Sequence, residues 1–177
     1  MSAPDHDAPE EVVWQGRFIA AIRRGKWEYV GRARNIHAAV IVAVTQGEVL
    51  LVEQYRVPLG ANCIELPAGL VGDEQEGEAL ELAAARELEE ETGYRPSEVH
   101  DAGRFASSPG LVSETFNLVV AKGLTRVSEG GGVEGENIIV HQVPLAGVAD
   151  FIAAKRAEGC LVDAKVLLLL GAGLLAG

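Results

Sequence analysis

The chain has 177 residues, of which 48% are hydrophobic and 23% are charged, and these values are typical of one folded globular domain. Its formal net charge is −11, and no clustered basic run offsets this charge, which argues against a nucleic-acid partner. The two cysteines, Cys63 and Cys160, have no His or Cys at ligand spacing around them. Neither a disulfide framework nor a zinc site is therefore expected.

The N-terminal region is expected to contain a disordered segment followed by a hairpin. Residues 1–11 are acidic and contain proline, whereas a signal peptide needs a basic start and an apolar stretch. Secretion is therefore not expected, and the predicted setting is cytoplasmic. Residues 17–22 and 26–32 flank a turn at Arg24-Gly25, and this pattern predicts two antiparallel strands.

Three apolar segments predict strands of a core sheet. Residues 37–45 are dense in Val, Ile and Ala, and residues 48–54 resume this pattern after a Gln-Gly turn, as adjacent antiparallel strands do. A short strand at residues 64–66 ends at Pro67, because proline has no N–H to continue the ladder. A glycine-rich loop through Gly77 is expected to follow.

The clearest element is a helix over residues 78–92. This stretch is rich in Ala, Leu, Glu and Arg, which are strong helix formers, and Gly93 supplies the expected C-terminal stop. Its apolar residues repeat at three- and four-residue spacing, so most of the acidic residues fall on other faces. The apolar positions are Leu80, Ala83, Ala84 and Leu88.

The remaining pattern predicts further strands and two closing helices. The expected strands are residues 99–105, 115–121 and 137–143, and the expected helices are residues 145–157 and 163–175. The most apolar run, residues 166–176, is shorter than the roughly 20 residues that span a bilayer, so a buried helix is expected there and no membrane segment. Together the elements predict the α/β class, with a mixed sheet packed between helices.

Three carboxylates crowd the end of the acidic helix. Glu87 and Glu91 are four residues apart and share a face, and Glu90 lies beside them. Since like charges repel at this spacing, a compensating cation is inferred, and oxygen ligands favour Mg²⁺ or Mn²⁺. Arg86 is four residues before Glu90 and is placed to brace that carboxylate.

A solvated surface is the alternative for this helix, because acidic helices usually face water. The flanking residues decide between the two interpretations, because they form a spaced motif around the carboxylates. The motif consists of Gly72, Glu78, Arg86, Glu87, Leu88, Glu90, Glu91, Gly93 and Tyr94. His37, His100 and His141 fall in expected strands and are predicted to be structural.

At these positions the chain resembles the Nudix hydrolase family, whose signature it matches at every fixed position. The resemblance implies an α/β/α sandwich with a mixed sheet, here with an N-terminal antiparallel hairpin in front of it. It also implies hydrolysis of a nucleoside diphosphate linked to another group. The implied metal ligands are Glu87, Glu90, Glu91 and the backbone carbonyl of Ala68, with Arg86 as the ion-pair partner of the glutamates.

One spacing departs from the family pattern. The stretch Leu66-Pro67-Ala68-Gly69 resembles the usual entry to the motif, but Gly69 lies three residues too early relative to Glu78. Either the loop carries a three-residue insertion, or Gly72 serves as the signature glycine. The assignment of Ala68 depends on this choice.

Features outside the motif resemble the ADP-ribose pyrophosphatase branch of the family. They are Glu53-Gln54-Tyr55-Arg56, Glu65-Leu66-Pro67-Ala68-Gly69, Ser108-Pro109-Gly110 with Glu114, Glu134-Gly135-Glu136-Asn137, and Asp163-Ala164-Lys165. The resemblance implies that Arg56 contacts substrate phosphate, for which guanidinium geometry is suited, and that Glu114 is a substrate-site carboxylate. It implies that Trp27 stacks on adenine, with Phe18 or Arg17 on the other side.

The resemblance also implies a catalytic base and an oligomeric state. The base is Glu134 or Glu136, in a glycine-rich stretch over residues 130–135 that we expect to be a mobile loop. Because the N-terminal strands reach a second subunit in the resembling enzymes, a homodimer is expected. The chain is accordingly divided into residues 1–11, a possible dimerisation element at 12–35 and a Nudix domain at 36–177.

The leading hypothesis from the sequence is an Mg²⁺-dependent hydrolase that converts ADP-ribose to AMP and ribose 5-phosphate. A second hypothesis keeps the enzyme class but takes another sugar nucleotide, FAD or a dinucleotide as substrate. A third hypothesis is a non-catalytic nucleotide-binding regulatory domain. The complete set of metal ligands argues against it, because a protein that only binds does not need all of Glu87, Glu90 and Glu91.

Overall fold

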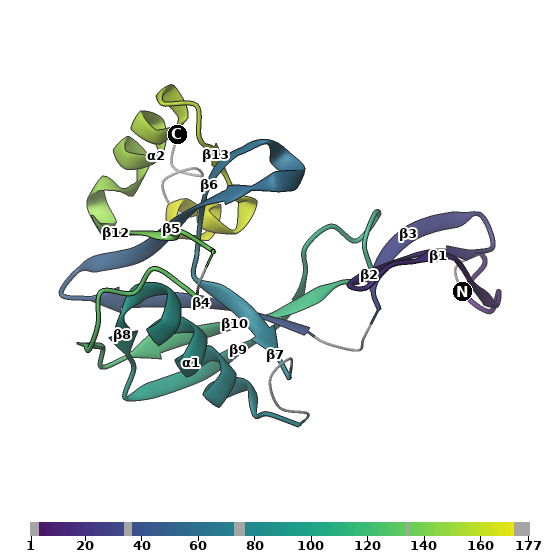
Figure 1. Ribbon diagram of the computed structural model, residues 1–177, viewed down its shortest axis with the longest axis horizontal. Helices are drawn as coiled ribbons and strands as arrows, with labels where there is room; N and C mark the ends of the chain where they lie inside the picture. Colours follow the sequence, from purple (N-terminus) through teal and green to yellow (C-terminus); the bar gives the residue numbers. More distant parts are fainter. Residues whose placement is uncertain (1–3, 34–36, 73–76, 134, 172–177) are drawn as a thin grey trace.

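The computed structural model describes residues 4–33, 37–72, 77–133 and 135–171, and its elements are arranged as in Figure 1. The strands are β1 (Glu10–Gln15), β2 (Ile19–Arg24), β3 (Trp27–Arg32), β4 (His37–Thr45), β5 (Glu48–Arg56), β6 (Ala61–Glu65), β7 (Ala68–Val71), β8 (Tyr94–Arg95), β9 (Glu98–Ala106), β10 (Thr115–Lys122), β11 (Thr125–Arg126), β12 (Ile139–Pro144) and β13 (Leu161–Val162). The helices are α1 (Leu80–Thr92) and α2 (Val148–Ala157), with 3₁₀ segments η1 (Val57–Leu59), η2 (Leu145–Gly147) and η3 (Ala164–Leu170).

Strand β4 is the centre of a mixed eight-stranded sheet. It pairs in parallel with β10 and antiparallel with β7, and its last two residues pair antiparallel with β5. Strand β5 continues the sheet to β6 and β12, while β13 lies beside β6 and β9 beside β10. The mixed sheet expected from the sequence is therefore confirmed.

Alternate residues of β4 face opposite sides of the sheet, as the pleat requires. Ile41 packs in a buried cluster with Leu88 of α1, whereas Val40 packs in a second cluster with Val148 and Ile152 of α2. Burial of each such aliphatic side chain stabilises the fold by about 1.5–3 kcal/mol. Because α1 and α2 cover opposite faces of the sheet, the expected α/β/α sandwich is also confirmed.

Helix α1 agrees closely with the helix predicted over residues 78–92. It ends at Thr92, and Gly93 follows in the left-handed conformation with a φ of 77°. The Gly93 N–H donates to the carbonyl of Glu89 at 2.9 Å and so closes the last turn. Since Ala83 and Leu88 are fully buried against the sheet, the helix is fixed in orientation, and its acidic side chains are placed with it.

The N-terminal hairpin predicted from the sequence is present as β2 and β3. Strand β1 pairs antiparallel with β2 and makes a three-stranded sheet; it begins at Glu10, inside the segment expected to be disordered. Figure 1 shows this sheet projecting from the rest of the molecule. It is tied to the loop after β9, because the Val30 N–H donates to Leu111 O and the Ser113 N–H donates to Val30 O, both at 2.9 Å.

Two predictions were wrong in detail. The segment after Pro67 is not wholly a loop, because β7 pairs with the first four residues of β4. The closing segment is a 3₁₀ helix in which Leu167 and Leu168 are 45% and 55% exposed, so it is not the buried helix expected. A 3₁₀ helix aligns every third side chain, so this leucine run cannot all face the sheet. Within the described ranges, no helix has the length and apolar character needed to cross a membrane.

Candidate active site

A cavity of about 500 Å³ lies where α1, β7 and the Glu136 loop meet the central sheet. Its carboxylates are Glu65, Glu87, Glu91, Glu114 and Glu136. Its cationic side chains are Arg32, Arg56 and Lys165. Acidic groups therefore outnumber cations on its walls, an arrangement that suits metal ions or a cationic ligand.

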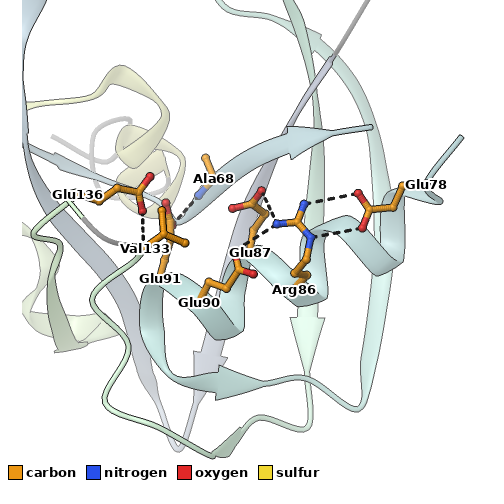
Figure 2. Close-up of polar contacts among 8 residues, drawn as sticks. All are labelled: Ala68, Glu78, Arg86, Glu87, Glu90, Glu91, Val133 and Glu136. Atoms are coloured by element: carbon orange, nitrogen blue, oxygen red, sulfur yellow. Dashed lines mark hydrogen bonds and ion pairs between the residues drawn. The ribbon is translucent and has the colours of Figure 1, made fainter. Parts of the chain in front are cut away.

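Arg86 organises the acidic side of α1, as Figure 2 shows. One of its terminal nitrogens lies 3.1 Å from Glu87 Oε1 and 3.2 Å from Glu90 Oε2, and its Nε lies 3.4 Å from Glu78 Oε1. The expected bracing of Glu90 by Arg86 is thus present. The guanidinium offsets repulsion among these carboxylates, and its planar fork fixes their direction.

Glu91 is one of two buried carboxylates of the cavity, and both it and Glu65 are 8% exposed. The pKa of Glu91 is raised to about 8, chiefly by burial and also by the nearby charges of Glu87 and Glu136, while the hydrogen bond from Ala68 and the charge of Arg56 act to lower it. The Ala68 N–H donates to Glu91 Oε2 at 3.1 Å (Figure 2). A buried carboxylate with this surplus of negative neighbours is stabilised in its charged form by a bound cation.

Gly69 and Gly72 are the two candidates for the signature glycine, and the structure places them differently relative to Glu87. A Cβ placed on Gly69 would lie 1.9 Å from Glu87 Cδ and 2.1 Å from Glu87 Cγ. The Glu87 side chain therefore occupies the space beside Gly69, which is in β7. Gly72 lies just beyond this strand with a φ of 85°, and residues 73–76, where an insertion would fall, lie outside the described residues.

The predicted substrate contacts Arg56 and Glu114 both line the cavity, and each has a charged partner. Arg56 forms a two-point contact with Glu65, at 2.6 Å and 2.8 Å. Glu114 accepts from Arg32 Nε at 2.5 Å. In each pair the carboxylate partly neutralises the charge of the arginine, Arg56 or Arg32, and holds its guanidinium in a defined orientation.

Lys165 was not assigned a role from the sequence, although it also lines the cavity. Its Nζ lies 2.6 Å from Asp163 Oδ2 and 5.7 Å from the centre of the Phe116 ring. The ring is in β10 and Lys165 is in η3, so the closing segment reaches the cavity. Arg32, Glu65 and Ser107 line the cavity as well and were given no role from the sequence. Glu65 belongs to a stretch that resembles the family, whereas no local motif marks Arg32 or Ser107.

Of the two candidates for the base, only Glu136 can be placed. It lines the cavity, and its Oε2 accepts from the Val133 N–H at 2.9 Å. Figure 2 shows its carboxylate next to Glu91. Glu134 lies outside the described residues.

The aromatic candidates Trp27 and Phe18 belong to the N-terminal sheet region and are 55% and 68% exposed. Neither lines the cavity of its own chain. The Arg17 guanidinium lies 5.0 Å from the centre of the Phe18 ring. Within one chain, then, these residues are not brought together with the acidic helix.

The donor set fits a hard divalent cation, because Glu87, Glu90 and Glu91 offer oxygen atoms and no sulfur or imidazole. Among the described residues, no group of three or more His, Cys, Asp or Glu side chains converges as ready-made metal ligands. Instead Glu87 and Glu90 contact Arg86, and Glu91 contacts the Ala68 amide. Metal binding would therefore require these side chains to exchange partners.

An α/β/α sandwich with an acidic helix beside a carboxylate-lined cavity offers the oxygen ligands that hard divalent cations prefer. Comparison with family models identifies the class of protein. The model described as NUDIX domain matches residues 34–138, so the chain belongs to the Nudix family of hydrolases. Members of this family generally use divalent metal cations.

Similar curated proteins include pyrophosphatases of nucleotide sugars. The chain is 38% identical to the ADP-sugar pyrophosphatase of Mus musculus, over 89% of this chain and 82% of that protein. It is 33% identical to the ADP-ribose pyrophosphatase of Bacillus subtilis (72% and 66% covered) and 35% identical to the methanol dehydrogenase activator of Bacillus methanolicus (76% and 70% covered).

A solved structure described as an ADP compounds hydrolase has the same fold. It superposes with a TM-score of 0.68 over 95% of this chain and 92% of its own, at 23% identity. At this identity the likeness supports the fold.

Proposed function

We propose that this Nudix hydrolase uses divalent metal ions, Mg²⁺ first among them, to cleave ADP-ribose into AMP and ribose 5-phosphate. The observation that carries the proposal is the buried Glu91 carboxylate beside Glu87 and Glu136 in one cavity. The cavity volume of about 500 Å³ is in the range of small-molecule sites. Relatives named ADP-ribose pyrophosphatase and ADP-sugar pyrophosphatase support the substrate class.

The metal ions would be held by Glu87, Glu90 and Glu91, with the carbonyl of Ala68 as a further ligand. When bound, such ions neutralise phosphate charge and lower the pKa of a bound water. Arg86 holds the side chains of Glu87 and Glu90 in fixed directions on α1, since it contacts both of them. Arg86 is thus proposed to orient the carboxylates that hold the metal ions.

The proposed reaction is an attack by water on one phosphorus of the diphosphate. The water oxygen forms the new P–O bond, the bond from that phosphorus to the bridging oxygen breaks, and the bridging oxygen leaves with the other phosphate. Glu136 is the proposed base for the water proton, because it lines the cavity beside Glu91. Glu134 remains the alternative base.

The charged side chains around the carboxylates are the proposed substrate contacts. Arg56 is held by Glu65 and is oriented to pair with phosphate oxygens. Glu114, held by Arg32, is the proposed carboxylate contact to a sugar hydroxyl. Trp27 and Phe18 are proposed to hold adenine, and because they lie away from the cavity of their own chain, this contact needs a second chain.

A homodimer is accordingly part of the proposal, with residues 12–35 as the dimerisation element and residues 36–177 as the hydrolase domain. Exposed apolar side chains on the N-terminal sheet support it: Val12, Val13, Trp14, Ile19 and Trp27 are 44–61% exposed. A cytoplasmic setting is proposed as well, and it is supported by Cys63 and Cys160, which are both free.

The first test is hydrolysis of ADP-ribose by the purified protein with Mg²⁺, followed by chromatography of the nucleotide products. AMP is expected in stoichiometric yield with ribose 5-phosphate, and removal of the metal with a chelator should stop its formation. Absence of AMP would overturn the proposal.

A panel of substrates separates ADP-ribose from the alternatives within the same enzyme class. Relatives named GDP-mannose pyrophosphatase, 35% identical in Cronobacter sakazakii, make GDP-mannose the first competitor, followed by FAD and a dinucleotide. ADP-ribose is expected to have the highest kcat/KM. A higher kcat/KM for any competitor would reassign the substrate and leave the enzyme class intact.

Replacement of Glu91 by Gln tests the metal platform. We expect Glu91→Gln to lower kcat by at least about 10²-fold without lowering the melting temperature of the metal-free protein, because the pKa of about 8 already favours the neutral carboxyl there. Glu89→Gln is the matched control on the same helix, since Glu89 pairs with Arg95 away from the cavity. Normal turnover in Glu91→Gln would refute the metal-site assignment.

A further inference from the structure

The end of α1 is covered by the backbone of residues 128–132, which we call the docked segment. The N–H groups of Gly131 and Gly132 donate to the carbonyls of Glu91 and Glu90, at 2.9 Å and 3.0 Å. The Ser128 N–H donates to Gly93 O at 3.2 Å. A helix leaves its last carbonyls without partners inside the helix, and here a distant part of the chain supplies them.

This close contact requires glycine on both sides. A Cβ on Gly130 would lie 2.4 Å from Thr92 C and 2.7 Å from both Glu91 O and Gly93 N. These are backbone atoms of the helix end and cannot move aside as a side chain does. On the other side, a Cβ on Gly93 would lie 2.3 Å from Ser128 O. The backbone of the docked segment therefore lies so close to the backbone at the end of α1 that a side chain at Gly130 would not fit between them.

The same segment leads directly to Glu136. The Val133 N–H donates to Glu136 Oε2 at 2.9 Å, and the Ile138 N–H donates to Gly131 O at 3.1 Å. A Cβ on Gly132 would lie 2.3 Å from Glu136 Oε2. The carboxylate of Glu136 thus fills the space that Gly132 leaves open, and the described part of the glycine-rich stretch is hydrogen-bonded to α1.

We propose that Gly130 and Gly132 are positioning residues for the hydrolysis, with Gly130 seating the docked segment on α1 and Gly132 leaving room for the Glu136 carboxylate beside Glu91. The inference rests on the proposed function, in which Glu136 is the base. In this proposal, the base Glu136 is held in place by the end of α1, and the same end of α1 carries the proposed metal ligands. A displacement of about 1 Å at such a site lowers turnover by about 10²-fold.

Gly130→Ala tests the seating of the docked segment. Gly135→Ala is the matched control, because Gly135 also has a positive φ, of 95°, but a Cβ there meets nothing within 4 Å. Amide exchange followed by NMR should show the Gly131 and Gly132 amides protected in the wild type and in Gly135→Ala, and exchanging faster in Gly130→Ala. Equal protection in Gly130→Ala would overturn the role of Gly130.

Gly132→Ala tests the placement of Glu136 and covers the case in which Gly130→Ala does not fold. The new methyl would meet side-chain atoms, Glu136 Oε2 at 2.3 Å and Ile138 Cδ1 at 2.9 Å, so the fold is retained while the carboxylate must move. The strain of a side chain at a φ of 76° is matched by the control, in which φ is 95°. In the Mg²⁺-loaded enzyme we expect a fall in kcat of about 10²-fold with KM changed less than about threefold, and Gly135→Ala should stay within about threefold of wild type in both.

A double-mutant cycle separates positioning from general damage. If Gly132 acts through Glu136, Gly132→Ala should lower kcat in the wild type but produce no further fall in the Glu136→Gln background. Additive losses would overturn the proposal. Failure of the wild type to hydrolyse ADP-ribose would refute the proposed function instead, and the amide-exchange result would still decide whether the segment is docked.

Discussion

Glu53 is a buried carboxylate whose charge is fully matched by its neighbours. It is 5% exposed and is contacted by Asn62 Nδ2 at 2.8 Å, His141 Nε2 at 2.9 Å and Lys155 Nζ at 3.1 Å. Burial alone raises its pKa, but the hydrogen bonds from Asn62, His141 and Lys155 outweigh burial and hold the pKa at about 2. This cluster joins β5, β6, β12 and α2 and is expected to stabilise the fold.

The pKa of Glu53 predicts a specific acid sensitivity. A folded pKa of about 2, against an ordinary value of 4.5, stabilises the protein by about 3 kcal/mol above pH 4.5, and this stabilisation is lost as the pH falls from 4.5 through 2. Urea unfolding at pH 7 should show Glu53→Gln less stable than wild type by about that amount, with the gap narrowing toward pH 3. Glu98→Gln, in exposed β9, is the control; a gap independent of pH would contradict the prediction.

At the scale of residues, the sequence predicts contacts that are close along the chain. Arg86 and Glu90 share a helix face and meet as expected. Arg32 and Glu114 are 82 positions apart, and Lys165 reaches the cavity only because η3 packs beside β10. No local spacing encodes such pairs, since the topology of the sheet brings them together.

At the scale of elements, the sequence predicts those with a buried face and a clear end. Strand β4 was predicted with its observed bounds, and α1 within two residues, because apolar periodicity and Gly93 mark them. Strand β1 was missed, since all six of its residues are exposed and show no alternation. Strand β7 was missed because its four residues follow a proline and include a glycine, both of which normally indicate a loop.

The contact between β7 and α1 can be tested at Gly69. Gly69→Ala would place a methyl 1.9 Å from Glu87 Cδ, so Glu87 must leave its position, and we expect kcat to fall by about 10²-fold. The melting temperature should change little, because the clash is with a side chain. Gly147→Ala, whose Cβ would lie an ordinary 3.9 Å from Pro144, should retain activity. Full activity in Gly69→Ala would refute the proposed importance of Glu87's position.

At the scale of the whole molecule, the N-terminal sheet is the feature that projects from the central sheet and its helices (Figure 1). It contacts the body near Val30, and most of its large apolar side chains are exposed. Exposed apolar surface of this kind marks association sites. This is the physical basis for the homodimer in the proposed function.

Sedimentation equilibrium tests the dimer directly. The wild type is expected at about twice the chain mass of 18.7 kDa, whereas Phe18→Glu, which places a charge beside the N-terminal sheet, should be monomeric. Leu82→Glu is the matched control, because Leu82 is similarly exposed, at 66%, but belongs to α1. A monomeric wild type, or a dimer in Phe18→Glu, would contradict the assignment of this sheet as the interface.

The N-terminal sheet also determines what the tryptophan fluorescence of this protein reports. The chain has two tryptophans, Trp14 and Trp27, and both lie in this sheet and are more than half exposed. Intrinsic tryptophan fluorescence therefore does not report on the central sheet, and it responds to changes around the N-terminal sheet. A shift of the emission to shorter wavelength on raising the protein concentration, or on adding an adenine nucleotide, would signal directly that these indole rings have left water.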